Sequence, residues 1–334
     1  MSSKRKRKYF EDEIFSLKDA KELILKIKML DGVTDLTLRA YKLLFNDFEK
    51  FFGNDVDVKS LTVDDARDYI FWQLHEKEPY SNSSRRNKKG EKGVSIRTAN
   101  NYLILAQSVF NVLEKEGITF NIFSSIKKIK EHEKMIETLT TDEINKLFRT
   151  FNKKNYVEFR NYVACHLMLD AYSRVSETLN IRRSDIDFKR KSVTFKRTKN
   201  KKIRTVPLSN ETLKLLRELI KENEDFDSEY VFLTIFGEPL DDATFRKNLY
   251  EVAERAEIKK NVYPHIFRHT ASKMFIEQGG SIRILQTILG HASVETTERY
   301  AHVLDQTIEN YHEHFSPIKK LKKKSKTRTS RQRR

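Results

Sequence analysis

The stretch of sequence that decides the fold runs from Pro264 to Tyr300 and reads PHIFRHTASKMFIEQGGSIRILQTILGHASVETTERY. His265 and Arg268 stand three residues apart just after the proline. Proline suits the first turn of a helix, because its missing N–H costs nothing there. The spacing then places both side chains on one helix face. Taken alone, the pair is better explained by a capping histidine beside a surface arginine than by a catalytic role.

The second half of this stretch predicts a turn followed by a short helix. Apolar residues recur at helical spacing over 282–289, and Gly290 is expected to close that helix as a left-handed cap. His291 follows at once, and Ser293 caps the next helix, which carries Tyr300. A tyrosine on a helix is usually a half-buried core residue with a tethered hydroxyl. A catalytic role for Tyr300 is therefore indicated only by the residues that surround it in the sequence.

Two more residues join this set from earlier in the chain. Arg174 follows an apolar helical stretch at 162–171 and precedes Glu177, so a buried arginine–glutamate pair is the structural alternative. Lys199 lies in a run of lysines, for which a solvated turn is the simpler explanation. Together, however, these six cationic, donor and phenolic groups could converge on one phosphate. Such a site suits phosphoryl transfer through a phosphotyrosine intermediate.

Composition predicts a two-domain protein that binds a polyanion. The chain has 334 residues and a formal net charge of +17. That surplus most often marks a nucleic-acid partner, although an unrelated basic protein or a protein of acidic membrane surfaces would also fit the charge alone. There is neither a bilayer-spanning apolar run nor a signal-peptide core, so we expect a cytoplasmic, DNA-associated protein without a membrane partner. The single cysteine, Cys165, is expected to be a buried structural thiol.

The first half of the chain predicts an all-helical domain. Residues 1–16 form a basic arm, and helical periodicity runs through residues 17–130. Thr62 begins a capping signal for a third helix, and a fourth helix starts near Ser95 and ends at Gly117. The charged residues 131–138 then predict an interdomain linker.

The second half predicts an α+β domain over residues 139–315, with a basic tail at 316–334. Thr140 is a candidate cap for its first helix. After Asp187 the hydrophobic period changes to two, which predicts a small β-hairpin or meander. The apolar positions of that pattern are Val193, Phe195, Ile203, Val206 and Leu208. The fold class is therefore mainly α with a small antiparallel β element.

Several other basic residues are candidates for contacts with DNA phosphates. Most lie in the polar loop at 79–93 or in the predicted β-turn. They are Arg85, Arg86, Lys88, Lys89, Arg97, Lys201 and Lys202.

The order Arg, Lys, His-x-x-Arg, His, Tyr resembles that of the tyrosine recombinase family, which includes phage integrases and Xer-like recombinases. LMLDAYSRVSETLNI at 167–181 is similar to the family's first box, and KNKKIRTVPL at 199–208 to its hairpin-lysine segment. HIFRHT at 265–270 and LGHAS at 289–293 are similar to the second box, and TTERYAHV at 296–303 to the nucleophile segment. The resemblance spans nearly the whole chain, because the helical first half is similar to the family's core-binding domain.

The resemblance implies a site-specific DNA recombinase that needs no metal, no ATP and no other cofactor. Arg174 and Arg268 would hold the scissile phosphate, and Tyr300 would attack it. His265 would take the phenol proton, and Lys199 would protonate the departing 5′-oxygen.

The remaining members of the set would support this chemistry. His291 would hydrogen-bond a non-bridging oxygen, and Glu177 and His269 would support the site. A 3′-phosphotyrosine and then a Holliday junction imply a homo-tetramer on two double-stranded recombination sites, with room for accessory proteins. Integration, excision and resolution of a mobile element or replicon all fit.

One departure from the family pattern concerns the turn before the first arginine. The family usually has Gly-Leu there, whereas this chain has Tyr172-Ser173. We expect a local change of turn geometry rather than lost activity. Near the C-terminus, apolar residues at helical spacing over 304–315 predict a helix that packs either on its own domain or on a neighbouring protomer.

Two other functions remain compatible with these motifs. A type IB topoisomerase shares the catalytic set but religates the same strand. A non-catalytic DNA-binding regulator built on a decayed recombinase would also carry the basic surface. The presence of all six chemical positions argues against decay.

Overall fold

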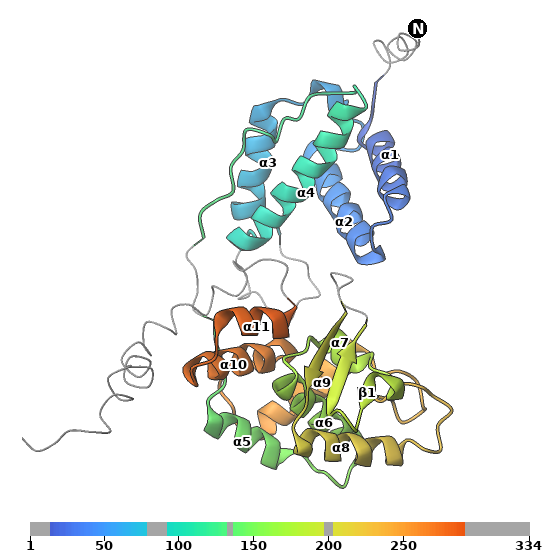
Figure 1. Ribbon diagram of the computed structural model, residues 1–334. Helices are drawn as coiled ribbons and strands as arrows, with labels where there is room; N and C mark the ends of the chain where they lie inside the picture. Colours follow the sequence, from blue (N-terminus) through green and yellow to red (C-terminus); the bar gives the residue numbers. More distant parts are fainter. Residues whose placement is uncertain (1–13, 79–91, 132–135, 197–202, 291–334) are drawn as a thin grey trace, which may run out of the picture. The chain divides into compact units, whose positions relative to one another are not determined.

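The computed structural model describes residues 14–78, 92–131, 136–196 and 203–290 (Figure 1). The chain forms two compact units, with unit 1 ending at Lys134 and unit 2 beginning at Met135. Both units are mainly helical, and unit 2 adds a three-stranded antiparallel sheet, so the predicted fold class is confirmed. Over the described ranges, no helix combines the length and the apolar character needed to cross a membrane.

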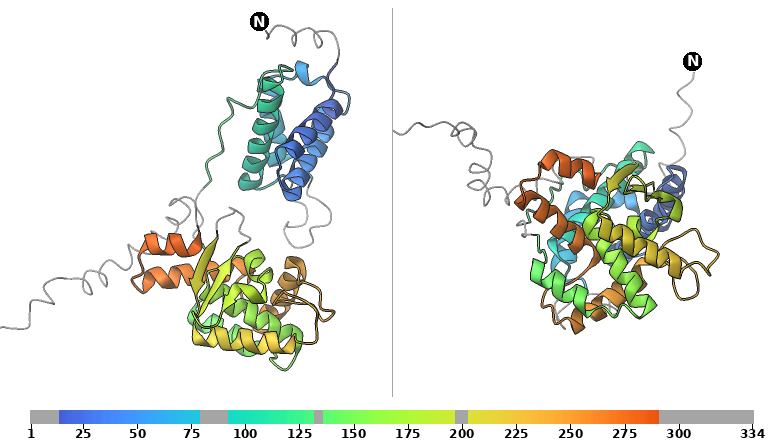
Figure 2. Two further views of the ribbon diagram at one scale, coloured as in Figure 1. Left: turned by 45° about the vertical axis from the view of Figure 1, so that its right-hand side comes forward. Right: turned by 60° about the horizontal axis from the view of Figure 1, so that its bottom comes forward.

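The described residues of unit 1 form a bundle of four α-helices with one short 3₁₀ helix (Figure 2). The capping prediction is confirmed at Thr62, whose hydroxyl accepts from the backbone N–H of Asp65. The fourth helix starts near Ser95 as predicted, and Ser95 is its N-cap. These elements are α1 (Leu17–Leu30), α2 (Asp35–Phe52), η1 (Val58–Ser60), α3 (Val63–His75) and α4 (Ile96–Lys115).

Aromatic rings fill the centre of unit 1. Phe48 of α2 is fully buried, and its ring centroid lies 4.9 Å from that of Tyr69, 6.3 Å from that of Phe110 and 6.0 Å from that of Phe123. Rings at such separations add specific edge and stacking contacts to the burial of their apolar area. The three partners come from α3, α4 and the segment after α4, so one side chain of α2 contacts three other parts of the bundle.

A buried ion pair crosses the same bundle. Lys77, just beyond α3, donates from Nζ to the carboxylate of Asp47 on α2 and to Oε1 of Gln73 at 3.1 Å. Gln73 Nε2 in turn lies 3.3 Å from Asp47 Oδ2 and donates to the hydroxyl of Tyr69 at 2.7 Å. Burial lowers the pKa of Lys77, and its hydrogen bond to Asp47 opposes that shift. The pair is held by several hydrogen bonds, as a buried charge requires.

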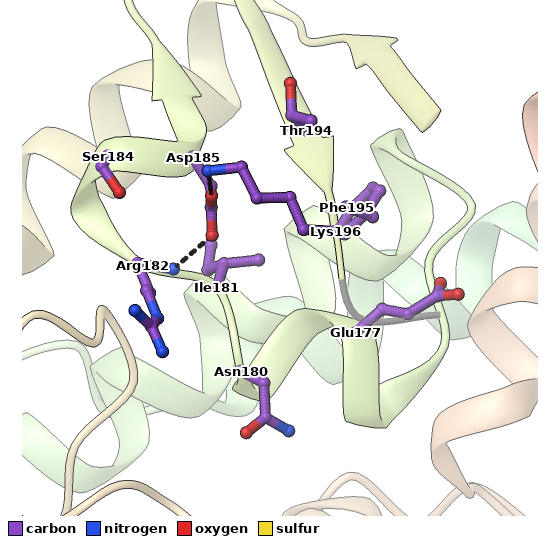
Figure 3. A pocket seen from close by; sticks show the side chains of 9 residues that line it. All are labelled: Glu177, Asn180, Ile181, Arg182, Ser184, Asp185, Thr194, Phe195 and Lys196. Atoms are coloured by element: carbon purple, nitrogen blue, oxygen red, sulfur yellow. Dashed lines mark hydrogen bonds and ion pairs between the residues drawn. The ribbon is translucent and has the colours of Figure 1, made fainter. Parts of the chain in front are cut away.

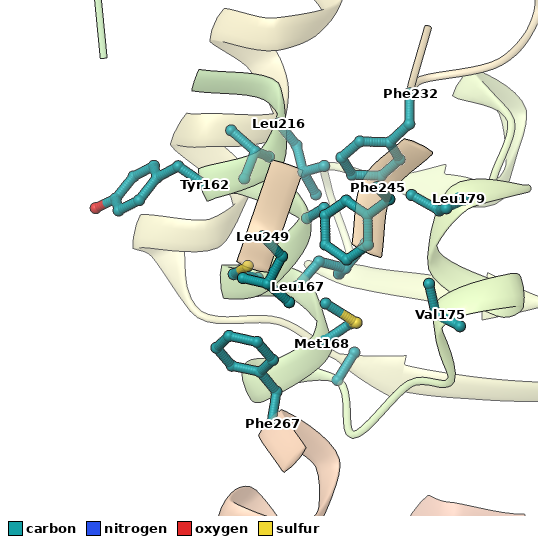
Figure 4. Packing of buried hydrophobic residues seen from close by; sticks show 14 of the residues in the cluster. Tyr162, Leu167, Met168, Val175, Leu179, Leu216, Phe232, Phe245, Leu249 and Phe267 are labelled. Atoms are coloured by element: carbon teal, nitrogen blue, oxygen red, sulfur yellow. The ribbon is translucent and has the colours of Figure 1, made fainter. Parts of the chain in front are cut away.

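Unit 2 is built around α6, which is buried on nearly all sides (Figure 4). Helices α8, α9 and α10 pack against it, and Cys165 in its centre is buried as predicted, which raises the pKa of that thiol. The helices are α5 (Thr141–Thr150), α6 (Tyr156–Asp170), α7 (Val175–Leu179), η2 (Arg183–Asp185), α8 (Asn210–Glu222), α9 (Asp242–Arg255), α10 (Pro264–Glu277) and α11 (Ile282–Leu289).

The sheet of unit 2 is the predicted meander, in the order β1 (Ile186–Asp187), β2 (Ser192–Phe195) and β3 (Arg204–Pro207). Val193 pairs with Val206, and both side chains are buried. The expectation for Ile203 is wrong, because its side chain is 69% exposed. Strand side chains alternate between two faces, so the face that buries Val206 also takes residues 204 and 208, and residue 203 turns outward.

The turn between α6 and α7 adopts a backbone conformation that favours glycine. Tyr172 has φ 53°, and its ring packs edge-on against Phe275 of α10 with centroids 6.1 Å apart. The hydroxyl of Ser173, also buried, lies 2.6 Å from that of Thr178. Tyrosine thus occupies the left-handed conformation itself, and ring packing offsets the modest cost of positive φ.

We predict that Lys77→Met destabilises unit 1 by about 3–5 kcal/mol, because it leaves the Asp47 charge buried without its cation. Denaturant unfolding followed by tryptophan fluorescence measures this directly. Trp72 is the single tryptophan of the chain and lies in α3, so the signal reports on unit 1.

Lys21→Met is the matched control, since Lys21 also pairs with a residue of α2. Its Nζ lies 2.8 Å from Glu49 Oε1, but the two side chains remain 26% and 29% exposed. Partly exposed pairs contribute about 0–1 kcal/mol. Equal losses in the two variants would contradict the importance assigned to burial.

Candidate active site

The structure describes part of the predicted site. Arg174, Glu177, His265, Arg268 and His269 all lie in unit 2, on α7, its N-cap and α10. Arg97 lies on α4 of unit 1, where its side chain is 71% exposed and its Nε is 3.4 Å from Glu131 Oε2. Nine predicted residues fall outside the described residues, namely Arg85, Arg86, Lys88, Lys89, Lys199, Lys201, Lys202, His291 and Tyr300.

Arg174 is held by Glu177 on the first turn of α7. It occupies the N-cap position, where its backbone N–H donates to Glu177 Oε2 at 2.9 Å and its Nη1 to Glu177 Oε1 at 2.8 Å. The glutamate side chain is 1% exposed, whereas the arginine side chain keeps 21% of its surface accessible. The arginine–glutamate pair weighed as a structural alternative therefore exists, and its cationic end still reaches solvent.

A second arginine grips the same carboxylate from strand β3. Arg204 donates from Nη1 to Glu177 Oε1 at 3.0 Å and from Nη2 to Oε2 at 2.8 Å, a two-pronged pair. Burial alone raises the pKa of Glu177, but the hydrogen bonds and charge of Arg204 and Arg174 more than offset this, so the pKa lies below its ordinary value. Glu177 is therefore ionised at neutral pH.

Arg204 is a site residue that the sequence prediction missed. A signal was present, because residue 204 shares a strand face with the buried Val206 and Leu208. A charged residue on an inward-facing strand position requires a buried partner. The identity of that partner, 27 residues earlier in the chain, depends on tertiary structure.

Arg268 enters the site from α10 and is buried, so the alternative of a surface arginine is wrong. Its Nη1 donates to the backbone carbonyl of Tyr172 at 2.7 Å, and its Nη2 to that of Leu289 at 2.8 Å. The same Nη1 lies 4.0 Å from Glu177 Oε2. Three guanidinium groups thus surround one carboxylate, which leaves the site with a net positive charge.

His265 begins α10 directly after Pro264, which occupies the first turn as predicted. Burial is the main cause that lowers the pKa of His265, and the charges of Arg268, Arg246 and Arg174 lower it further. The imidazole is therefore neutral at pH 7 and can accept a proton. His269, one turn later, has its ring centroid 6.5 Å from that of His265.

Helix α11 ends at Leu289, two residues before His291. Gly290 caps this helix in the left-handed conformation, with φ 64°, as predicted. Helices α10 and α11 lie side by side (Figures 1 and 2), and Leu285 and Leu289 of α11 are buried with Ile276 of α10. The backbone carbonyl of Leu289 also accepts the hydrogen bond from Arg268. The segments that begin at His265 and at Leu289, which together form the second sequence box, are therefore in contact.

A cavity of about 270 Å³ lies beside this cluster, between α7, η2 and β2 (Figure 3). Lys196 reaches Asp185 across it, with Nζ 2.6 Å from Oδ1, whereas the carboxylate of Glu177 points away from the cavity. Its polar side chains do not converge on a common point, so the arginine cluster is the better candidate for chemistry. In the described part of the chain, no three His, Cys, Asp or Glu side chains are placed to hold a metal ion.

Comparison with known proteins points to one family. The model of the phage integrase family matches residues 137–307, just over half of the chain. A tyrosine recombinase of Thermosipho africanus is 34% identical over 226 residues, which cover 67% of this chain and 76% of the relative. The tyrosine recombinase XerC of Staphylococcus aureus is 25% identical over 306 residues, which cover 90% of this chain and 96% of the relative.

Solved structures share the fold. The integrase of the transposon Tn1549, in complex with transposon right-end DNA, superposes with a TM-score of 0.70 at 18% identity, covering 90% of this chain and 99% of the other. The XerH site-specific recombinase bound to a palindromic difH substrate superposes with a TM-score of 0.67 at 21% identity, covering 91% and 85%. Given the matched domain and the similarity to curated relatives, the chain belongs to the phage integrase family of tyrosine recombinases.

Proposed function

We propose that this recombinase cuts and rejoins double-stranded DNA at a specific site through a 3′-phosphotyrosine intermediate and a Holliday junction. The observation that carries the proposal is the cluster of Arg174, Arg204 and Arg268 around the single carboxylate of Glu177. The cluster has more guanidinium groups than carboxylates. Such a site suits a phosphodiester, because each planar guanidinium can donate two hydrogen bonds to the negatively charged phosphate oxygens.

In the first step, the phenol oxygen of Tyr300 attacks the scissile phosphorus and the bond from phosphorus to the 5′-oxygen breaks. The phenol proton passes to His265, and Lys199 gives a proton to the departing 5′-oxygen. The products are a 3′-phosphotyrosyl strand and a free 5′-hydroxyl, so the energy of the phosphodiester bond is conserved. Arg174 and Arg268 stabilise the added negative charge of the pentavalent transition state.

The second step reverses the first with a different strand. A 5′-hydroxyl from a partner duplex attacks the phosphotyrosine, which joins new strands and releases the phenol. Two such rounds pass through a Holliday junction and require four protomers on two sites. His291 hydrogen-bonds a non-bridging oxygen in each round, and His269 and Glu177 support the arginines.

The proposal assigns DNA binding to both halves of the chain. Residues 17–130 act as the core-binding domain and residues 139–315 as the catalytic domain, joined by the linker at 131–138. DNA phosphates are contacted by Arg97 and by the basic residues at 85–89 and 201–202. The related Tn1549 integrase and XerH were both solved with DNA, which supports this assignment.

We predict that the wild-type protein forms a covalent adduct with DNA and that Tyr300→Phe abolishes it, because the variant lacks the attacking oxygen. The protein is incubated with a supercoiled plasmid library of random inserts, and adducts are trapped with detergent. Sequencing of the attached DNA then defines the cleaved site.

Tyr250→Phe is the control, since the hydroxyl of Tyr250 lies on α9 and donates to Glu254 at 3.0 Å. This variant should form adducts at the wild-type rate. A wild-type protein without any adduct would argue for a non-catalytic regulator. Adducts with relaxation of plasmids that lack a specific site, and without strand exchange, would instead indicate a type IB topoisomerase.

We predict that the rate of adduct formation falls in acid only below about pH 6.5, the ordinary pKa of histidine. The base must be neutral, and His265 has a lowered pKa, so its neutral form persists as the pH falls until that lowered pKa is reached. Rates are measured in single turnover across the pH range, and circular dichroism checks that the fold survives.

Arg246→Met should move this acid limb to higher pH. Arg246 is one of the cations that lower the pKa of His265. Its Nε also donates to Oδ1 of Asp242 at 2.8 Å, and the charge of Asp242 raises the pKa of His265. Arg255→Met, on the same helix, is the control and should leave the limb in place. A limb that does not respond to Arg246→Met would exclude His265 as the base.

A further inference from the structure

We propose that Arg204 is a positioning residue for DNA cleavage, which acts by saturating Glu177 so that the carboxylate does not compete with the phosphate for Arg174 and Arg268. The inference rests on the proposed function of this site. It concerns a residue on β3 that the catalytic set inferred from the sequence does not include.

Glu177 has no remaining capacity to accept hydrogen bonds. Its two oxygens accept four N–H groups among the described residues, two from Arg174 and two from Arg204. A carboxylate offers about four lone-pair sites, so it is fully occupied. Arg268 accordingly keeps its Nη1 at 4.0 Å from Oε2 and donates to two backbone carbonyls instead.

Arg204 is packed on several sides and is largely inaccessible to a substrate. Its side chain is 9% exposed, and its guanidinium carbon lies 4.7 Å from the centroid of the Phe195 ring. On another side it borders the cap of α11, where a Cβ added at Gly290 would lie 3.3 Å from Arg204 Cδ and Nη1. Arg204 therefore acts through Glu177 rather than on the phosphate.

Without Arg204, one lone pair on each oxygen of the buried carboxylate loses its donor, although Arg174 still donates to both oxygens. A buried charge with fewer donors attracts nearby cations more strongly. Among the described residues, two such cations are Arg174, already bonded to Oε1, and Arg268, whose Nη1 lies 4.0 Å from Oε2. Both would turn toward Glu177, and the phosphate would lose the donors that stabilise its transition state.

A purely structural salt bridge would give a different pattern of effects, and a double variant separates the two. Arg204→Met should slow adduct formation by about 10²-fold, the lower end of the loss for one transition-state donor. Adding Glu177→Gln should then restore part of the rate, because the amide still offers one acceptor to Arg174 but carries no charge that competes with phosphate. A structural role predicts that the rate only follows the folded fraction, so that the double variant is no faster than Arg204→Met once each rate is divided by the folded fraction from circular dichroism.

The experiment uses the full-length protein and an oligonucleotide duplex that carries the sequence recovered from wild-type adducts. Arg160→Met is the matched control. Arg160 is also a buried arginine of unit 2, but it donates to the carbonyl of Leu233 and to Asn161. It should lower the unfolding midpoint without slowing cleavage by the protein that remains folded.

The possible results are distinct. A wild-type protein that forms no adduct refutes the proposed function, whatever the variants do. A wild-type protein that cleaves overturns the role of Arg204 if Arg204→Met is as fast, or if the double variant is no faster than Arg204→Met. A slow Arg204→Met together with a double variant that is faster per folded protein establishes it.

Discussion

The buried carboxylate of Glu177 makes the rest of the site possible. Three guanidinium groups could not gather in a poorly solvated region without a counter-charge, because each would repel the others and lose its water. One carboxylate offsets part of that repulsion and fixes two of the three by hydrogen bonds. Its own charge is too small to neutralise all three, so the site keeps the positive potential that a phosphodiester needs.

The position of that carboxylate depends in turn on the helix at the centre of unit 2. Helix α6 is enclosed by α8, α9 and α10, and its end at Asp170 sets the start of the left-handed turn at Tyr172. That turn delivers Arg174 and Glu177 on α7, while β3 and α10 bring the other two arginines. The elements that pack the core of unit 2 therefore also position the charged side chains of the site.

Local signals made much of this arrangement predictable. The caps at Thr62 and Thr140, the helix start near Ser95 and the left-handed Gly290 depend on neighbours within a few residues, and all four are as expected. The resemblance of sequence boxes brought Arg174, His265 and Arg268 together in advance. That part of the site could be predicted because each box spans a single helix start.

Long-range effects account for what could not be predicted. Ile203 looked like a strand residue, but register places it outward, and register is set by the pairing of Val193 with Val206. Arg204 gained its role only from a partner on another element. The period of two places residue 204 on the inward face with Val206, but it does not identify the carboxylate that pairs with it.

The way Arg268 is anchored has a consequence for how this site can vary between related chains. Two of its hydrogen bonds go to main-chain oxygens of Tyr172 and Leu289, not to their side chains. Peptide oxygens are supplied by every amino acid, so natural drift at either position can proceed while the anchor is retained. Tyr172 illustrates that latitude, because its carbonyl accepts from Arg268 in a left-handed conformation that favours glycine, while its ring packs separately against Phe275.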